Sequence, residues 1–304
     1  LGFFICVIIV VVNGFVWGLM DIDSNMVKLG STPSYTVSDL YGYKPYAPGL
    51  SWFHTYWMLF AGLLGVAAVC LWPRGKESGF FKRLDLAAQE WKNYRWAGIG
   101  VFLIWLCTAG FTFYNTRMLN PTVSGDEQER RQIRYEKEYK RFQGFPQPRI
   151  YDTKYDIRIF PETRSYEADG QLWVRNLHDR PLDSLLVQVP NQGKFTFENE
   201  RLSLLLNDSA LYLRFYKISP ALAPGDSMLL KFNTVYRSKG FENQLSNTSI
   251  TQNGTFFNNT DISPSFGYQE GGELSDKNER RKKGLPEKSR MPALDTANLA
   301  ARSN

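Results

Sequence analysis

The stretch YDTKYDIRIF, residues 151–160, places Tyr151, Thr153, Tyr155, Ile157 and Ile159 at every second position, with polar residues between them. A period of two is typical of a β-strand with two chemically different faces. The runs GQLWVRN, LLVQV, LSLLL, LYLRFYKI and SMLLKFNTVYR follow at short intervals, separated by turn signals such as APGD. Many short strands without intervening amphipathic helices predict an antiparallel β-sandwich, which we assign to residues 150–240.

A charged segment precedes these strands. The run SGDEQERRQIRYEKEYKRF, residues 124–142, begins with Ser124 and Glu127 in the spacing of a helix capping box. Its first turn is acidic and its last turn basic, which complements a helix dipole. Its apolar stripe is thin, so we expect a stalk, or a helix lying along a domain, within a linker of residues 115–149.

Three runs without a charged residue come before the linker: residues 1–20, 51–72 and 96–114. At about 1.5 Å per residue, each is long enough to cross the hydrocarbon core of a bilayer. Trp and Tyr cluster at the ends of the second and third runs, as in membrane interfaces. We therefore predict a transmembrane region, residues 1–114, with three spans.

Two alternatives remain for these runs. The first run could be a signal peptide, but it lacks a starting Met, a basic leader and a clear cleavage site. The second and third could form a buried hairpin in a soluble protein. A chain that opens with Leu inside an apolar run is expected to be an internal part of a longer protein.

The distribution of Lys and Arg predicts the orientation. The loop of residues 73–95 carries six of them, whereas the longer loop of residues 21–50 carries only Lys28 and Lys44. The six are Arg74, Lys76, Lys82, Arg83, Lys92 and Arg95. Cytoplasmic loops retain positive charge, so the shorter loop is predicted to be cytoplasmic, either as an interfacial amphipathic helix or as a simple helical turn. The chain is then an integral inner-membrane protein with everything after Tyr114 on the extracytoplasmic side.

The sequence contains few residues of the kinds used in catalysis. Cys6, Cys70 and Cys107 lie in the apolar runs, where a thiol behaves as a small hydrophobe. A hydrolytic zinc centre commonly needs three protein ligands, and the only histidines are His54, at a membrane interface, and His178, in a predicted turn. Neither a nucleophile elbow nor a phosphate-binding Gly loop is visible. We therefore predict no catalytic, cofactor-binding or metal-binding residue.

Three further patterns have ordinary explanations. Asp152 and Asp156 would share the solvated face of a strand. The sequons at Asn207, Asn247, Asn253 and Asn258 matter only in a eukaryotic secretory pathway. The segment ELSDKNERRKKGL, residues 273–285, holds five basic residues, but acids are interspersed and it lies far beyond the last span. We expect it to be solvated surface within an irregular segment, residues 241–304, and we do not expect a nucleic-acid partner.

Several motifs together resemble a known family. YNTRMLNP, YEKEYKRF with a following Pro-x-Pro, NGTFFNN, PSFGYQ and ELSDKNERRKKGL occur in this order between Tyr114 and Leu285. In this order they are similar to bacterial membrane proteins in which an ABC-2-type transporter permease is fused to an aminopeptidase N-like zinc metallopeptidase. The resemblance covers nearly the whole chain, and YDIRIFPETRSYEADGQLWVRN looks like the opening hairpin of the aminopeptidase N-terminal β domain.

The resemblance implies a function for the parent protein. The Gly-Ala-Met-Glu-Asn segment and the HExxH helix of that family do not occur in this chain, so no catalytic residue is transferred and zinc is expected only in a following peptidase domain. The chain would anchor and position that domain, with the lipid bilayer and a cytoplasmic ATPase subunit as further partners. The alternative is a membrane-tethered sensor or binding module whose β-sandwich recognises a ligand or envelope protein.

Overall fold

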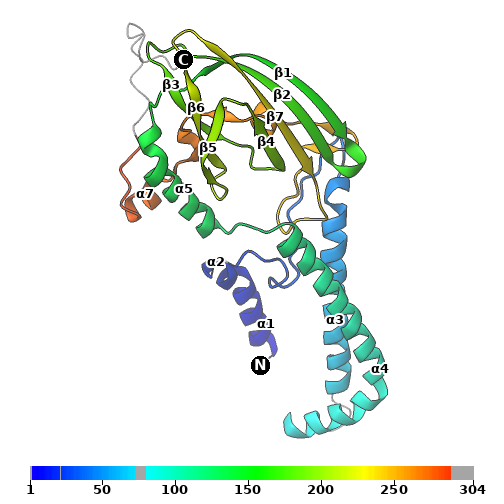
Figure 1. Cartoon of the computed structure of the whole chain (residues 1–304). Helices are drawn as coiled ribbons and strands as arrows, with labels where there is room; N and C mark the ends of the chain where they lie inside the picture. Colours follow the sequence, from blue (N-terminus) through cyan, green and yellow to red (C-terminus); the bar gives the residue numbers. More distant parts are fainter. Residues whose placement is uncertain (1, 21, 73–79, 289–304) are drawn as a thin grey trace.

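The computed structural model describes residues 2–20, 22–72 and 80–288. The chain forms a helical part followed by a mainly antiparallel β domain, as predicted. Figure 1 shows the β domain at one end of a pair of long helices, with the start of the second long helix at the far end of that pair. The end of the pair next to the β domain is called the outer end below.

The two long helices are α3, Ala47–Leu71, and α4, Phe80–Phe113, which lie side by side (Figure 1). A short 3-10 turn, η2, Lys44–Tyr46, leads into α3, and a π-helical turn, η3, Tyr114–Leu119, continues α4. The most apolar 18-residue stretches within residues 44–71 and 84–119 have mean hydropathies of 1.6 and 1.7, and only 11% and 17% of these stretches are buried. A core helix of a soluble protein would be mostly buried, so both helices have the length and exposure of membrane spans.

The prediction of three spans is wrong by one. The first apolar run forms α1, Gly2–Val11, a π-helical turn η1, Val12–Val16, and α2, Trp17–Leu19. Its apolar helix covers only residues 3–19, which is shorter than the about 20 residues a span needs. Within this run, the Asn13 side chain donates to the carbonyl of Leu29 at 3.0 Å and accepts from the Leu29 amide at 2.6 Å. This polar contact ties the second half of the run to the following loop.

The predicted cytoplasmic loop is largely helical. Residues 80–95 are continuous with the rest of α4, so the amphipathic stretch extends a long helix instead of forming a separate one. The Trp91 ring folds over Gly98, where an added Cβ would lie 2.7 Å from it. Arg74 and Lys76 lie outside the described residues.

The β domain is a sandwich of two four-stranded antiparallel sheets. The first sheet has the order β1-β2-β7-β4, with β1 Arg149–Phe160, β2 Ser165–Arg175, β7 Ser227–Arg237 and β4 Lys194–Glu198. The second has the order β10-β3-β6-β5, with β10 Ser265–Phe266, β3 Leu182–Gln188, β6 Leu213–Leu222 and β5 Leu202–Asp208. A small ribbon pairs β8, Ile250–Thr251, with β9, Gly254–Thr255.

The core lies between the two sheets and follows the period of two. Leu172 and Val174 of β2, with Leu230 of β7, pack against Leu185 and Val187 of β3. All five side chains are fully buried, and each such burial stabilises the fold by about 1.5–3 kcal/mol. Because alternate residues point to opposite faces, β2 and β7 present mainly polar side chains on the outer surface of the first sheet.

Helix α5, Gly125–Tyr139, lies along the β domain, which was one of the two predicted alternatives. The Ser124 side chain caps it by accepting from the Glu127 amide at 3.3 Å. Tyr135 and Tyr139 pack on Leu186 and Leu213 of the second sheet. The remaining short elements are η4 Lys140–Phe142, η5 Pro161–Thr163, α6 Asn259–Ile262, η6 Glu270–Gly272 and α7 Lys277–Lys282.

Candidate functional site

The junction between the helix pair and the β domain is formed by the segment of residues 239–247, which follows β7. Its Phe241 side chain is only 5% exposed. The ring lies between the two long helices, with centroid distances of 6.3 Å to Phe53 of α3 and 6.1 Å to Phe111 of α4. Gly49 of α3 lies beside it, since a Cβ there would be in van der Waals contact with Phe241 at 3.6 Å. The β domain thus inserts an aromatic wedge between the outer ends of the helices.

Asparagine side chains close the junction around this wedge. Asn120, just after α4, donates to the carbonyls of Lys239 at 2.6 Å and Phe241 at 3.1 Å. Asn243 accepts from the Asn25 amide at 2.9 Å, and the Asn25 side chain donates to the Asn243 carbonyl at 2.5 Å. Three segments far apart in sequence are therefore joined through backbone groups, which fixes their relative position.

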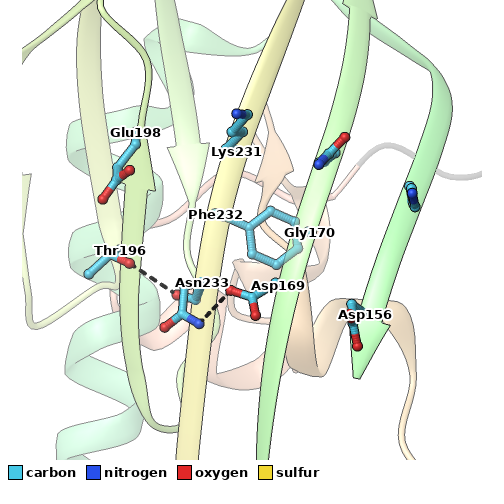
Figure 2. A pocket seen from close by; sticks show the side chains of 10 residues that line it. Asp156, Asp169, Gly170, Thr196, Glu198, Lys231, Phe232 and Asn233 are labelled. Atoms are coloured by element: carbon cyan, nitrogen blue, oxygen red, sulfur yellow. Dashed lines mark hydrogen bonds between the residues drawn. The ribbon is translucent and has the colours of Figure 1, made fainter. Parts of the chain in front are cut away.

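A second feature is a polar depression of about 410 Å³ on the outer face of the first sheet. Figure 2 shows side chains from all four strands of this sheet around it. Its lining consists of Lys154, Asp156, Asp169, Gly170, Gln171, Thr196, Glu198, Lys231, Phe232 and Asn233. Apart from Gly170 and Phe232, every member has a polar side chain.

The strand register arranges most of these residues in two rows across the sheet. One row runs Asp156, Asp169, Asn233, Thr196, and the next runs Lys154, Gln171, Lys231, Glu198, each in the order β1, β2, β7, β4. Neighbouring strands lie about 4.8 Å apart, so adjacent members of a row are within reach of one ligand.

Hydrogen bonds hold three members of the first row in place. Asn233 donates to Asp169 at 2.9 Å, and the Thr196 hydroxyl donates to the Asn233 carbonyl at 3.4 Å (Figure 2). Asp156 lies opposite Asp169, an unfavourable pairing of like charges that Arg158 offsets with a 3.1 Å bond to Asp169.

Four charged groups of the depression are not engaged. The side chains of Lys154, Lys231, Asp156 and Glu198 make no hydrogen bond or ion pair with another residue in the described part of the chain. The lining offers both hydrogen-bond donors and acceptors, which suits the binding of a polar ligand.

A third feature is a buried ion pair between α5 and α7. Arg280 and Glu136 are 2% and 3% exposed, and two parallel bonds of 2.7 and 2.8 Å join them. The hydrogen bond from Arg280 lowers the pKa of the Glu136 carboxyl below its usual range. Beside this pair, Tyr268 donates to Glu273 at 2.8 Å, and burial raises the pKa of the Tyr268 hydroxyl well above its ordinary value.

This ion pair corrects the expectation that the basic segment of residues 273–285 is solvated surface. Arg280 is buried, whereas Arg281, Lys282 and Lys283 of the same run are exposed. Arg280 also donates to the carbonyl of Leu274 at 2.7 Å. The segment therefore packs against α5 through Arg280, while its other basic side chains face solvent.

The two histidines lie in different parts of the fold. His54 is exposed in α3, and His178 is exposed in the loop after β2, with Nε2 3.1 Å from the Gln147 carbonyl. Within residues 2–20, 22–72 and 80–288, no three His, Cys, Asp or Glu side chains are grouped so that they could hold a metal ion. Of the predicted carboxylate pair, Asp156 lines the depression, and Asp152 shares its strand face.

The fold and these sites define a β-sandwich joined to a pair of helices that are long and apolar enough to cross a membrane. The sequence matches no protein-family model. A comparison with curated proteins also finds no significant match.

Proposed function

We propose that this chain is a membrane-anchored module that holds its β domain in a fixed orientation at the membrane surface. The junction carries this proposal. A flexible tether would need only the covalent link after α4, but here Phe241 and Asn243 return from beyond β7 to bind the helices and the loop before them. Such a return contact restricts rotation of the domain about its linker.

The contacts of the loop of residues 22–46 indicate the depth of the helices in the bilayer. Tyr56 donates to the Met26 carbonyl at 3.2 Å, and Trp57 donates to the Ser31 carbonyl at 2.8 Å. Irregular backbone avoids lipid-exposed positions in the hydrocarbon core. The first two to three turns of α3 therefore belong to the junction, and the membrane boundary is expected near Tyr56 and Trp57.

Orientation and location are part of the same proposal. The six-to-two imbalance of Lys and Arg favours a cytoplasmic start of α4 in the inner membrane, which puts the β domain on the extracytoplasmic side.

The resemblance supports a narrower proposal, in which the module belongs to a permease and positions an aminopeptidase N-like zinc domain, with a cytoplasmic ATPase as partner. Reading the gene beyond codon 304 tests it directly. A HExxH motif within the next few hundred codons is expected, and an early stop codon would remove the peptidase from the proposal.

The main proposal is tested by replacing Phe241 with Ala. We expect the protein to stay in the carbonate-washed membrane fraction while the β domain becomes mobile, because the wedge is lost but the spans are kept. Spin labels at Lys217→Cys in β6 and Lys92→Cys in α4, with the native cysteines replaced by Ala, report the distance by pulsed electron spin resonance. A narrow distribution is expected for the parent and a broad one for Phe241→Ala.

Phe256→Ala is the matched control, because Phe256 belongs to the same region after β7 but is 78% exposed. It should leave the distribution narrow. Equal broadening in both variants, or a broad distribution in the parent, would show that the junction does not fix the domain.

A second candidate function is a tethered binding module. The polar depression favours it, because hydrogen bonds hold Asp169 and Asn233 in place while four charged side chains around them have no partner within the described residues.

A further inference from the structure

We infer that the outer face of the first sheet binds a neutral oligosaccharide, with the polar depression and Trp173 as the two parts of the site. The inference deepens the binding-module candidate and rests on it. It is independent of whether the helices anchor the chain in a membrane.

The chemistry of the lining suits hydroxyl groups. A sugar hydroxyl donates and accepts hydrogen bonds at once, so it needs donors and acceptors side by side. The depression places donors and acceptors side by side on adjacent strands: Asp169 accepts hydrogen bonds and Lys231 donates them. Three further side chains can do both, namely Asn233, Gln171 and Thr196. The bond from Asn233 to Asp169 holds these two groups in place before a ligand arrives, which reduces the ordering cost of binding.

An aromatic ring adjoins the polar groups on the same face. Residues 169, 171 and 173 of β2 share one side of the sheet, because alternate strand positions point the same way. Leu172 and Val174 point into the core, so Trp173 points outward, and its side chain is partly exposed opposite Leu229. An aromatic ring packs its apolar face against the C–H groups of a sugar ring while polar neighbours take the hydroxyls.

The balance of charges favours a neutral ligand. Lys154 and Lys231 are matched by Asp156 and Glu198, while Arg158 compensates Asp169. A nucleic acid would need an excess of basic groups. A peptide strand would add to a sheet edge through its backbone, whereas on this face the backbone groups of β2 and β7 already pair within the sheet. The volume of about 410 Å³ lies in the range of ligand pockets.

The test uses the full chain in lipid nanodiscs, titrated by calorimetry with maltohexaose, cellohexaose and chitohexaose, and with an uncharged hexapeptide of Gly, Ser and Asn. Saturable binding of at least one hexasaccharide is expected. Trp173→Ala and Lys231→Ala should each weaken it by about tenfold or more, because one removes the platform and the other a donor. The matched control Lys217→Ala removes an exposed lysine from the other sheet and should leave the affinity unchanged.

Three outcomes would overturn the inference: no saturable binding of any hexasaccharide, equal weakening by Lys217→Ala, or tighter binding of the peptide that is lost in the same variants. Circular dichroism of each sample confirms that the β domain is folded, so that loss of binding is not loss of structure. Flotation of the same nanodiscs reports membrane insertion separately. A chain that floats without binding sugar keeps the anchoring proposal and loses this one.

Discussion

At the scale of single residues, the ion pair of Arg280 and Glu136 joins α7, near the end of the described chain, to α5. We expect Arg280→Met to lower the free energy of unfolding by about 1–3 kcal/mol, because it removes two hydrogen bonds from the buried Glu136 carboxylate and leaves Lys140 as its remaining partner. Urea unfolding in detergent, followed by near-UV circular dichroism, measures the change. Arg281→Met alters an exposed neighbour and should stay within about 0.5 kcal/mol of the parent.

A compensating variant separates loss of the pair from loss of packing. Combining Arg280→Met with Glu136→Leu removes both charges and should recover much of the stability, since apolar residues often replace a buried ion pair well. An unchanged unfolding midpoint for Arg280→Met alone would show that the pair does not hold α7 to α5.

The same residues mark a limit of prediction from sequence. In the run ERRKK the four basic side chains are chemically alike, and only Arg280 is buried. Its partner Glu136 lies 144 positions away on α5, so no local spacing distinguishes it from its neighbours. Phe241 was missed for a similar reason, because its contacts in α3 and α4 are far from it in sequence.

At the scale of elements, local patterns predicted well wherever one period governs a whole segment. The alternation in residues 151–160 correctly predicted strand β1, and Ser124 was correctly predicted to cap the N-terminus of α5. The first apolar run was wrongly predicted as a span, since its apolar helix covers only residues 3–19 and hydropathy alone does not fix where a helix ends. The outer-face depression was beyond prediction, since its rows depend on the order β1-β2-β7-β4.

Gly170 of β2 tests the packing of the first sheet. A Cβ there would lie 2.1 Å from the Phe232 ring of the neighbouring strand, so Gly170→Ala must displace that ring. We expect it to lower the free energy of unfolding by about 1–3 kcal/mol, the range for overpacking a core. The midpoint of urea unfolding measures it.

Two variants check the cause. Gly271→Ala has no atom within 4 Å of the added Cβ and should have little effect. Adding Phe232→Leu to Gly170→Ala makes space and should restore part of the loss. If Gly170→Ala matched the parent, the close approach of this ring would not constrain the sheet.

At the scale of the whole molecule, the helix pair separates two groups of residues. The β domain lies at the outer end, and the start of α4 lies at the opposite end (Figure 1). If α3 and α4 both cross a bilayer, these two regions must lie on opposite sides of it. The imbalance of Lys and Arg then predicts which side each one occupies.

We therefore expect opposite labelling of two exposed lysine positions after each is changed to Cys in a chain whose native cysteines are replaced by Ala. Lys217→Cys in β6 should react with a membrane-impermeant maleimide in intact spheroplasts, whereas Lys92→Cys in α4 should react only after permeabilisation. The reverse pattern would invert the orientation and move the β domain to the cytoplasm. Labelling of both positions in intact spheroplasts would show that α3 and α4 do not separate them, and the proposal of a membrane-spanning helix pair would fail.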